Sequence, residues 1–185
     1  MKTQLKKELD YVDATRKKRQ AMAQKVLRDP ECFPFLLELA LEASNTTGSR
    51  AAWVLEFVVR ERPSLLYPFL DDFTRGLNRV AVEPAIRSLA KVCEMLLTSH
   101  YDFRDKTDKP PLTRAHKEAM TAACFDWLIG AKKVAPKAYS MHSLLLLGTE
   151  IGWVHPQLKG ILEQHYADGS PAYQARARQV LRKLS

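Results

Sequence analysis

The stretch SRAAWVLEFVVRERPSLLYPFL, residues 49–70, decides the fold of this chain. Its first part has a helical composition, but apolar residues surround most of the helix and leave only a narrow polar strip at Glu56 and Arg60. A helix that is apolar on several sides must be covered on several sides. Arg62-Pro63 ends that helix, because the residue before a proline avoids helical geometry, and a second apolar run begins at once. The stretch therefore predicts one helical hairpin packed between neighbouring hairpins.

Comparable breaks divide the rest of the chain into short helices. Ser49 is expected to cap the helix that it opens, since its hydroxyl can accept from a backbone N–H of the first turn. Prolines such as Pro84 and Pro171 stand where a first helical turn needs no N–H. Strand-type turn signals are nearly absent, which indicates an all-α chain. The expected helices cover residues 13–27, 31–43, 49–61, 64–77, 82–97, 113–129, 136–151, 156–167 and 171–184.

The helix starts repeat at a regular spacing. Ser49 lies 34 residues before Glu83, and Pro136 lies 34 residues before Ser170. The spacing from Pro84 to Pro136 is 52 residues, which is about one period plus the polar stretch of residues 98–113. A repeat of paired helices with this period is typical of an α-solenoid. We therefore predict a single domain, residues 1–185, built as an α-α superhelix of about nine helices in antiparallel pairs with an inserted polar loop at 98–113.

The two ends of the predicted stack are basic. Residues 1–28 contain nine Lys and Arg against three acidic residues and are expected to form a capping helix. The last segment, residues 170–185, places its apolar residues on one arc, with Arg176 and Lys183 on one flank and Arg178 and Arg182 on the other. A one-sided helix suits the exposed end of a solenoid. Residues 170–185 are therefore expected to form a C-terminal capping helix.

The residues of the central hairpin resemble a known class of repeats. SRAAWVLEFVVRERPSLLYPFLDDF, residues 49–73, is similar to a HEAT or armadillo-type repeat, with an apolar first helix, a proline at the break and a second helix that ends in acids. The general resemblance extends over roughly residues 30–185. It implies an armadillo-like, all-helical scaffold whose concave face binds a partner.

The C-terminal half has a narrower resemblance. FDWLIGAKKVAPKAYSMHSLLLLG and WVHPQLKGILEQHYADGSPAYQARARQVLRKL are similar to a family of small bacterial proteins of unknown function, mostly from Bacteroidetes. Some members are labelled adenylosuccinate lyase. That label implies a much longer enzyme with a mobile loop of the type GSSxMPxKxN, and GSPAYQARAR at residues 169–178 continues as a helix instead. We therefore interpret the label as a mistaken transfer and predict no lyase activity.

Composition limits the class of protein further. The formal net charge is +8, and both ends of the chain are more basic than residues 29–77. Such an excess favours polyanions and also serves solubility. No apolar run is long enough to cross a bilayer, and the first residues do not form a secretory signal. A cytoplasmic protein without membrane contact is expected.

No residue pattern points to catalysis. Nucleotide-binding and hydrolase signatures such as GxxxxGK[ST] and GxSxG are absent from the sequence. The odd number of cysteines and their apolar surroundings indicate buried, reduced thiols. The histidines lack metal-ligand spacing and are interpreted as scattered surface residues, and the three tryptophans as core residues. We expect no metal, no cofactor and no enzyme activity. These residues are Cys32, Cys93, Cys124, His100, His116, His142, His155, His165, Trp53, Trp127 and Trp153.

The polar stretch of residues 98–113 is the best partner-binding candidate, because insertions in solenoids gather on one face and often contact partners. It mixes aromatic and cationic residues, which suits a peptide or a polyanion. Alternatively it is a connector whose aromatic residues pack back onto the core. With the basic residues of the last helix, the candidates are His100, Tyr101, Phe103, Arg104, Lys106, Lys109, Arg176, Arg178 and Arg182.

Two functions follow from this reading. The first is a non-catalytic HEAT-like interaction module that binds a protein or peptide on its concave face or inserted loop. The alternative is nucleic-acid binding through a basic groove, with a possible role in repair. A deep basic groove would favour nucleic acid, and a shallow mixed groove would favour a peptide.

Overall fold

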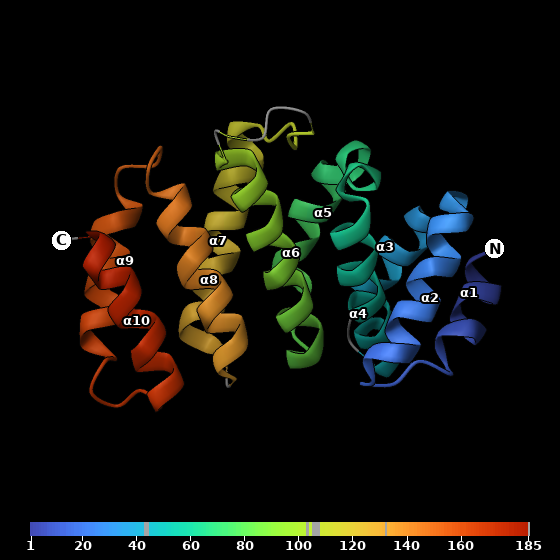
Figure 1. The fold of residues 1–185 in the computed structure, drawn as a ribbon, viewed down its shortest axis with the longest axis horizontal. Coiled ribbons are helices and arrows are strands. Elements are labelled where there is room, and N and C mark those ends of the chain that lie inside the picture. Colours follow the sequence, from blue (N-terminus) through green and yellow to red (C-terminus); the bar gives the residue numbers. More distant parts are fainter. Residues whose placement is uncertain (43–44, 103, 105–107, 132, 185) are drawn as a thin grey trace.

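The computed structural model describes residues 1–42, 45–102, 104, 108–131 and 133–184. Within these ranges the chain is helical, it contains no strand, and ten α-helices follow one another along an elongated body with the two termini at opposite ends (Figure 1). The helices are α1 (Lys2–Leu9), α2 (Arg16–Arg28), α3 (Phe33–Leu41), α4 (Thr46–Glu61), α5 (Leu70–Gly76), α6 (Glu83–Tyr101), α7 (Arg114–Gly130), α8 (Val134–Leu147), α9 (Val154–Gln164) and α10 (Pro171–Leu184). Short 3₁₀ turns cover Pro30–Cys32, Pro63–Leu65, Tyr67–Phe69 and Leu77–Arg79. The all-α prediction is confirmed.

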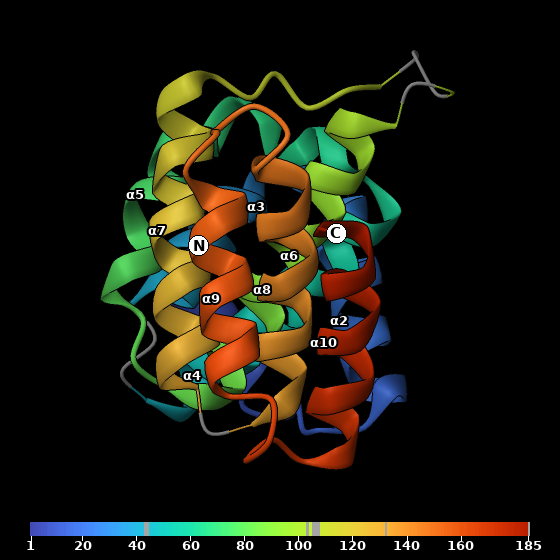
Figure 2. The ribbon, with the colours of Figure 1, turned by 90° about the vertical axis from the view of Figure 1, so that its left-hand side faces the viewer.

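The helices form two rows. Among the even-numbered helices, α2 packs on α4, α4 on α6, α6 on α8 and α8 on α10. Among the odd-numbered helices, α1 packs on α3, α3 on α5 and α5 on α7. Contacts such as α3 with α4, α7 with α8 and α8 with α9 join the rows. Figure 2 looks along the molecule, with α5 and α7 at the left, α10 at the right and α9 and α8 between them. Most helices therefore pack on the next helix of the same parity, which gives the two rows.

Helix α4, the first half of the opening stretch, lies in the middle of this packing. The second half was expected to be a helix over residues 64–77, but it forms the 3₁₀ turns Pro63–Leu65 and Tyr67–Phe69, and α5 begins only at Leu70. Helix α4 contacts α2, α3 and α6, so it has neighbours on several sides, as its apolar circumference predicts. Val54, Leu55 and Val58 are fully buried. On the odd-numbered row α5 approaches α3 closely, and a Cβ atom at Gly76 would lie 2.7 Å from Leu41 Cδ1. A side chain at this position would therefore require Leu41 to shift.

The start of α4 differs from the expectation. The helix begins at Thr46, and Asn45 is the capping residue, because its side-chain oxygen accepts from the Gly48 N–H at 3.0 Å. Ser49 is instead buried within the first turn, where its hydroxyl bonds to the Asn45 carbonyl. The prediction that Ser49 caps this helix was therefore wrong, since asparagine is an equally good cap one turn earlier.

The N-terminal segment also differs. Residues 1–28 were expected to form one capping helix, but they form α1 and α2. Leu5, Leu9 and Val12 are buried, and α1 packs on α3 and α4. The Asp13 carboxylate accepts from both the Thr15 N–H, at 2.9 Å, and the Thr15 hydroxyl, at 2.6 Å. This local turn competes with helix continuation and separates the two helices.

The inserted segment is shorter than expected at its first end. Helix α6 continues to Tyr101, so residues 98–101, which were assigned to the polar loop, are its last turn. At the other end, Thr113 caps α7 by accepting from the His116 N–H, while the His116 ring accepts from the Thr113 N–H. This reciprocal capping box fixes where the connection ends.

Candidate functional site

The two rows differ sharply in charge. The even-numbered helices together contain fifteen Lys and Arg residues against four Asp and Glu. The odd-numbered helices contain seven of each kind. The excess positive charge of the helices therefore belongs to one row, and its centre is a polar network that crosses that row.

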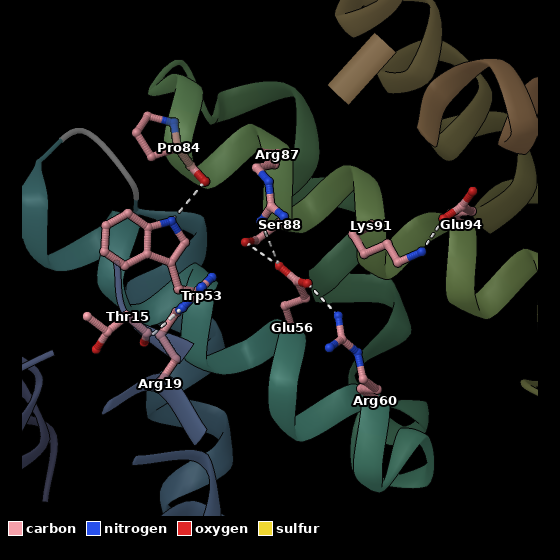
Figure 3. A network of polar contacts seen from close by, with 10 residues as sticks. All are labelled: Thr15, Arg19, Trp53, Glu56, Arg60, Pro84, Arg87, Ser88, Lys91 and Glu94. Atoms are coloured by element: carbon pink, nitrogen blue, oxygen red, sulfur yellow. Dashed lines mark hydrogen bonds and ion pairs between the residues drawn. The ribbon is translucent and has the colours of Figure 1, made fainter. Parts of the chain in front are cut away.

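The first centre of this network is Glu56 on α4, whose side chain is only 3% exposed. Its carboxylate accepts from Arg60 one turn later at 2.7 Å and, from α6, from the Ser88 hydroxyl at 2.7 Å and from Arg87 at 3.4 Å (Figure 3). Burial of a carboxylate is tolerated when hydrogen bonds and opposite charges surround it. Glu56 therefore fixes α4 against α6 and holds two arginines at the surface.

Helix α2 joins the network through an aromatic ring. The guanidinium groups of Arg19 and Arg60 lie over the Phe57 ring, at 5.2 and 5.0 Å from its centroid. The Arg19 guanidinium has a lowered pKa, first because of burial and, against the attraction of Glu56, because of the nearby charges of Arg87 and Arg60. Burial is the main cause of this shift, and the neighbouring arginines add to it.

The second centre is Glu94 on α6, whose side chain is 7% exposed. It accepts from Lys91 at 2.6 Å and from His142 Nδ1 on α8 at 2.9 Å, and Arg176 Nη2 on α10 lies 4.0 Å away. Lys91 also lies over the Tyr139 ring of α8, at 4.7 Å from its centroid. Burial alone would raise the pKa of Glu94, but the bonds from His142 and Lys91 outweigh it, so the pKa is lowered and the carboxylate is ionised at neutral pH.

Together these residues form a continuous band across α2, α4, α6, α8 and α10. We call it the cationic belt; it consists of Arg19, Arg60, Arg87, Lys91, Arg176, His142 and the carboxylates Glu56 and Glu94. Five permanent cations surround two carboxylates, so the permanent charges of the belt sum to +3. Each guanidinium has five N–H donors, so an arginine that binds a carboxylate retains donors for a ligand.

Two pockets of about 420 Å³ lie along the belt. One lies between α4 and α6 and includes Arg60, Lys91 and Glu94 in its wall. The other lies between α8 and α10 and includes His142 and Arg176. Because Glu94 contacts residues of both, the belt connects the two pockets.

The predicted residues of the 98–113 segment lie apart from the belt. His100 and Tyr101 are in the last turn of α6, where Tyr101 packs on the core and His100 Nδ1 lies 3.3 Å from the Pro110 carbonyl. Lys109 donates to the His100 carbonyl at 3.2 Å, so it ties the connection to the helix end. Arg104 is the most exposed, at 94%, beside Asp102. Tyr101 fits the connector alternative. Phe103 and Lys106 lie outside the described residues.

The three predicted arginines of α10 separate into two groups. Arg176 belongs to the belt and, with Arg182, lines the pocket between α8 and α10. Arg178 faces α9 instead and donates to the Tyr166 hydroxyl at 3.0 Å. Arg182 also lines the shallow hollow that contains Arg178. The structure therefore brings Arg176 and Arg182 together and places Arg178 on another side.

Several single-residue expectations need correction. His116 was interpreted as a surface histidine, but it is buried as part of the cap of α7, and its Nε2 lies 2.6 Å from Asp71 Oδ1. Trp153 was expected in the core, but it is 59% exposed and stacks on Phe125. It lies directly before α9, outside the helix itself. Cys93 and Cys124 are buried as predicted, whereas Cys32 is half-buried.

Most of the belt was missed by sequence reasoning. A partial signal existed, since Glu56 and Arg60 were the narrow polar strip of an otherwise apolar helix. Nothing in the sequence shows that Arg87 and Ser88, 31 and 32 residues later, meet that strip. The register between α4 and α6 decides this contact.

Other kinds of site find no support in the described part of the chain. Among its residues, no group of three or more His, Cys, Asp or Glu side chains could hold a metal ion. None of its helices combines the length and the apolar character that a membrane span requires. Comparison of the chain with protein-family models, curated proteins and solved structures gave no match. The functional argument therefore depends on the geometry alone.

The pairing of Glu94 predicts a pH effect on stability. Because its folded-state pKa is below that of the unfolded chain, Glu94 contributes stability above the unfolded pKa of about 4.3, and this is lost as pH falls through the folded pKa. At pH 7 Glu94→Gln should lower the free energy of unfolding by about 1.5–3 kcal/mol, since it removes charge-assisted hydrogen bonds. Urea unfolding of both proteins at several pH values measures this difference. The difference should shrink toward zero in acid; a difference that is constant with pH would contradict the assignment.

Proposed function

We propose that this protein binds nucleic acid through the cationic belt and performs no chemistry on it. The observation that carries the proposal is the separation of charge between the rows, fifteen cations against four acids on one and seven against seven on the other. Cations gathered along one face attract a polyanion and bind it with release of its counterions. The face is continuous over five helices, which suits an extended ligand.

The belt favours phosphate contacts over base contacts. Its aromatic rings, Phe57 and Tyr139, are covered by cations and are therefore not free to stack on bases. The donors that remain are guanidinium and ammonium groups, which bind phosphate oxygens without reading sequence. We therefore propose binding with little sequence preference. A protein or peptide was the ligand class favoured by the sequence alone. An acidic peptide is the form of it that would compete for the belt, and it is an outcome of the test below.

We also propose that the two rows are a HEAT-type α-α superhelix and that it serves as a non-catalytic scaffold. The order of contacts supports this, because the most extensive contacts join helices that are adjacent in the chain, such as α3 with α4 and α7 with α8, or two places apart, such as α4 with α6 and α6 with α8. Both buried carboxylates of the belt are engaged by cations, which supports a structural and electrostatic role for Glu56 and Glu94.

Binding should depend steeply on salt. We expect a labelled duplex of about 20 base pairs to bind at 50 mM salt, with a loss of affinity of up to about 500-fold at 200 mM if each of the five permanent cations of the belt contacts a phosphate. Fluorescence anisotropy of duplex and single-stranded probes of several sequences measures both affinity and selectivity. Similar affinity for all sequences is expected.

Two outcomes would contradict this proposal. One is the absence of binding to any nucleic acid at low salt. The other is tight binding of an acidic peptide that nucleic acid of equal charge does not displace, which would assign the belt to a protein partner.

A further inference from the structure

The pocket between α8 and α10 differs from the rest of the belt in the kind of charge that lines it. Its polar lining consists of His142, Arg176, Gln179, Arg182 and Lys183, with apolar contributions from Leu145 and Val180. Among the described residues no carboxylate lines it. The pocket between α4 and α6, by contrast, contains Glu94 and Asp102. The pocket between α8 and α10 is therefore lined by four side chains that can donate a hydrogen bond, three of them permanently charged, together with His142, whose Nδ1 is bonded to Glu94.

The wall of this pocket is held in place from behind. His142 is bonded to Glu94 through Nδ1 at 2.9 Å, which leaves Nε2 as its second polar atom, and Arg176 lies 4.0 Å from the same carboxylate oxygen. Arg182 and Lys183 lie in the last turn of α10, further along the helix than Arg176. His142 comes from α8, and the three cations all come from α10, which packs on α8. Arg176 and His142 are placed by Glu94, whereas Arg182 and Lys183 are exposed at the rim.

We propose that this pocket binds a phosphate monoester, the terminal phosphate of a nucleic-acid strand or of a nucleotide. A monoester carries a charge of about −1.5 to −2 at neutral pH, against −1 for an internal phosphodiester, and presents three acceptor oxygens. Three cations concentrated in one pocket match the larger charge, and the forked guanidinium groups of Arg176 and Arg182 match the oxygen geometry. A volume of about 420 Å³ has room for the nucleoside attached to the phosphate. The assignment of this pocket to the terminal phosphate of a nucleic-acid strand depends on the proposed function.

The test compares strands that differ only at their ends. Oligonucleotides of one sequence carrying a 5′-phosphate, a 3′-phosphate or hydroxyl ends are titrated with the protein at constant salt, and a nucleoside monophosphate is titrated separately by calorimetry. We expect one phosphorylated strand to bind about tenfold more tightly than the hydroxyl strand, the equivalent of one good charged contact. Arg182→Gln with Lys183→Gln should abolish this preference. Arg178→Gln with Lys159→Gln, which removes the same charge outside the pocket, should retain it.

The outcomes separate this inference from the proposed function. Equal affinity for all three strands, with no binding of the monophosphate, overturns the pocket assignment and leaves belt binding intact. Binding of the monophosphate alone, lost in the Arg182 and Lys183 variant, supports the pocket and contradicts nucleic-acid binding. No binding of any probe overturns both. A preference that survives in the Arg182 and Lys183 variant also overturns the assignment.

Discussion

Replacing Arg19, Lys91 and Arg176 by glutamine in one variant is expected to weaken duplex binding about 100-fold or more at 50 mM salt. The three residues come from α2, α6 and α10, so the variant removes positive charge at both ends and in the middle of the belt. Each lost phosphate contact should reduce the slope of log affinity against log salt by about 0.9, or close to three in total. A salt titration of wild type and variant measures both effects.

The choice of residues protects the fold. After the three substitutions Glu56 retains Arg60, Arg87 and Ser88, and Glu94 retains His142. The control carries Lys6→Gln, Lys7→Gln and Lys159→Gln on α1 and α9, the same loss of charge on exposed residues of the other row. Equal weakening in both variants would mean that total charge, rather than its location, controls binding.

Glu56→Gln is expected to lower the free energy of unfolding without lowering the affinity for nucleic acid. The substitution removes a buried carboxylate that accepts three hydrogen bonds, and we expect a loss of about 2–4 kcal/mol in the free energy of unfolding. Its arginine partners are about 40% exposed and can be rehydrated, which keeps the cost from being larger. Because one negative charge leaves the belt, affinity for nucleic acid should stay equal or increase. Urea unfolding and anisotropy on the same samples measure both.

A loss of affinity in folded Glu56→Gln protein would show that the carboxylate itself is needed for binding. Glu61→Gln is the matched control, since this residue ends α4 and is exposed. It removes the same charge from the same helix without touching the belt and should leave stability nearly unchanged.

Much of the fold could be predicted because it follows from local pattern. The apolar circumference of residues 49–61 predicted a helix covered on several sides, and α4 has such neighbours. Proline positions predicted helix starts well, since Pro84 lies in the first turn of α6 and Pro171 opens α10. The errors at Ser49 and in residues 1–28 arose at two short polar side chains that form local hydrogen bonds with the backbone. Asn45 caps α4 before Ser49 can, and Asp13 forms a turn that interrupts the expected single helix.

The candidate site could be predicted much less well. Arg176 and Arg182 were selected for their charge at the end of the chain, and both line a pocket. The belt residues on α4, α6 and α8 are brought together only by helix packing, as Glu94 and His142 illustrate, 48 positions apart. Each of them alone looks like an ordinary surface or boundary residue. Charge patterns along a sequence do not show which helices share a face.

Lysine reactivity in the presence of nucleic acid tests the central claim most directly. The protein, alone and saturated with duplex at low salt, is treated with an amine-acetylating reagent, and modification is quantified by mass spectrometry. Lys91 and Lys183 of the even-numbered row should be protected, while Lys6, Lys7 and Lys159 of the odd-numbered row should react as in the free protein. Protection of the odd-numbered row, or of both rows equally, would contradict the assignment of binding to the cationic belt.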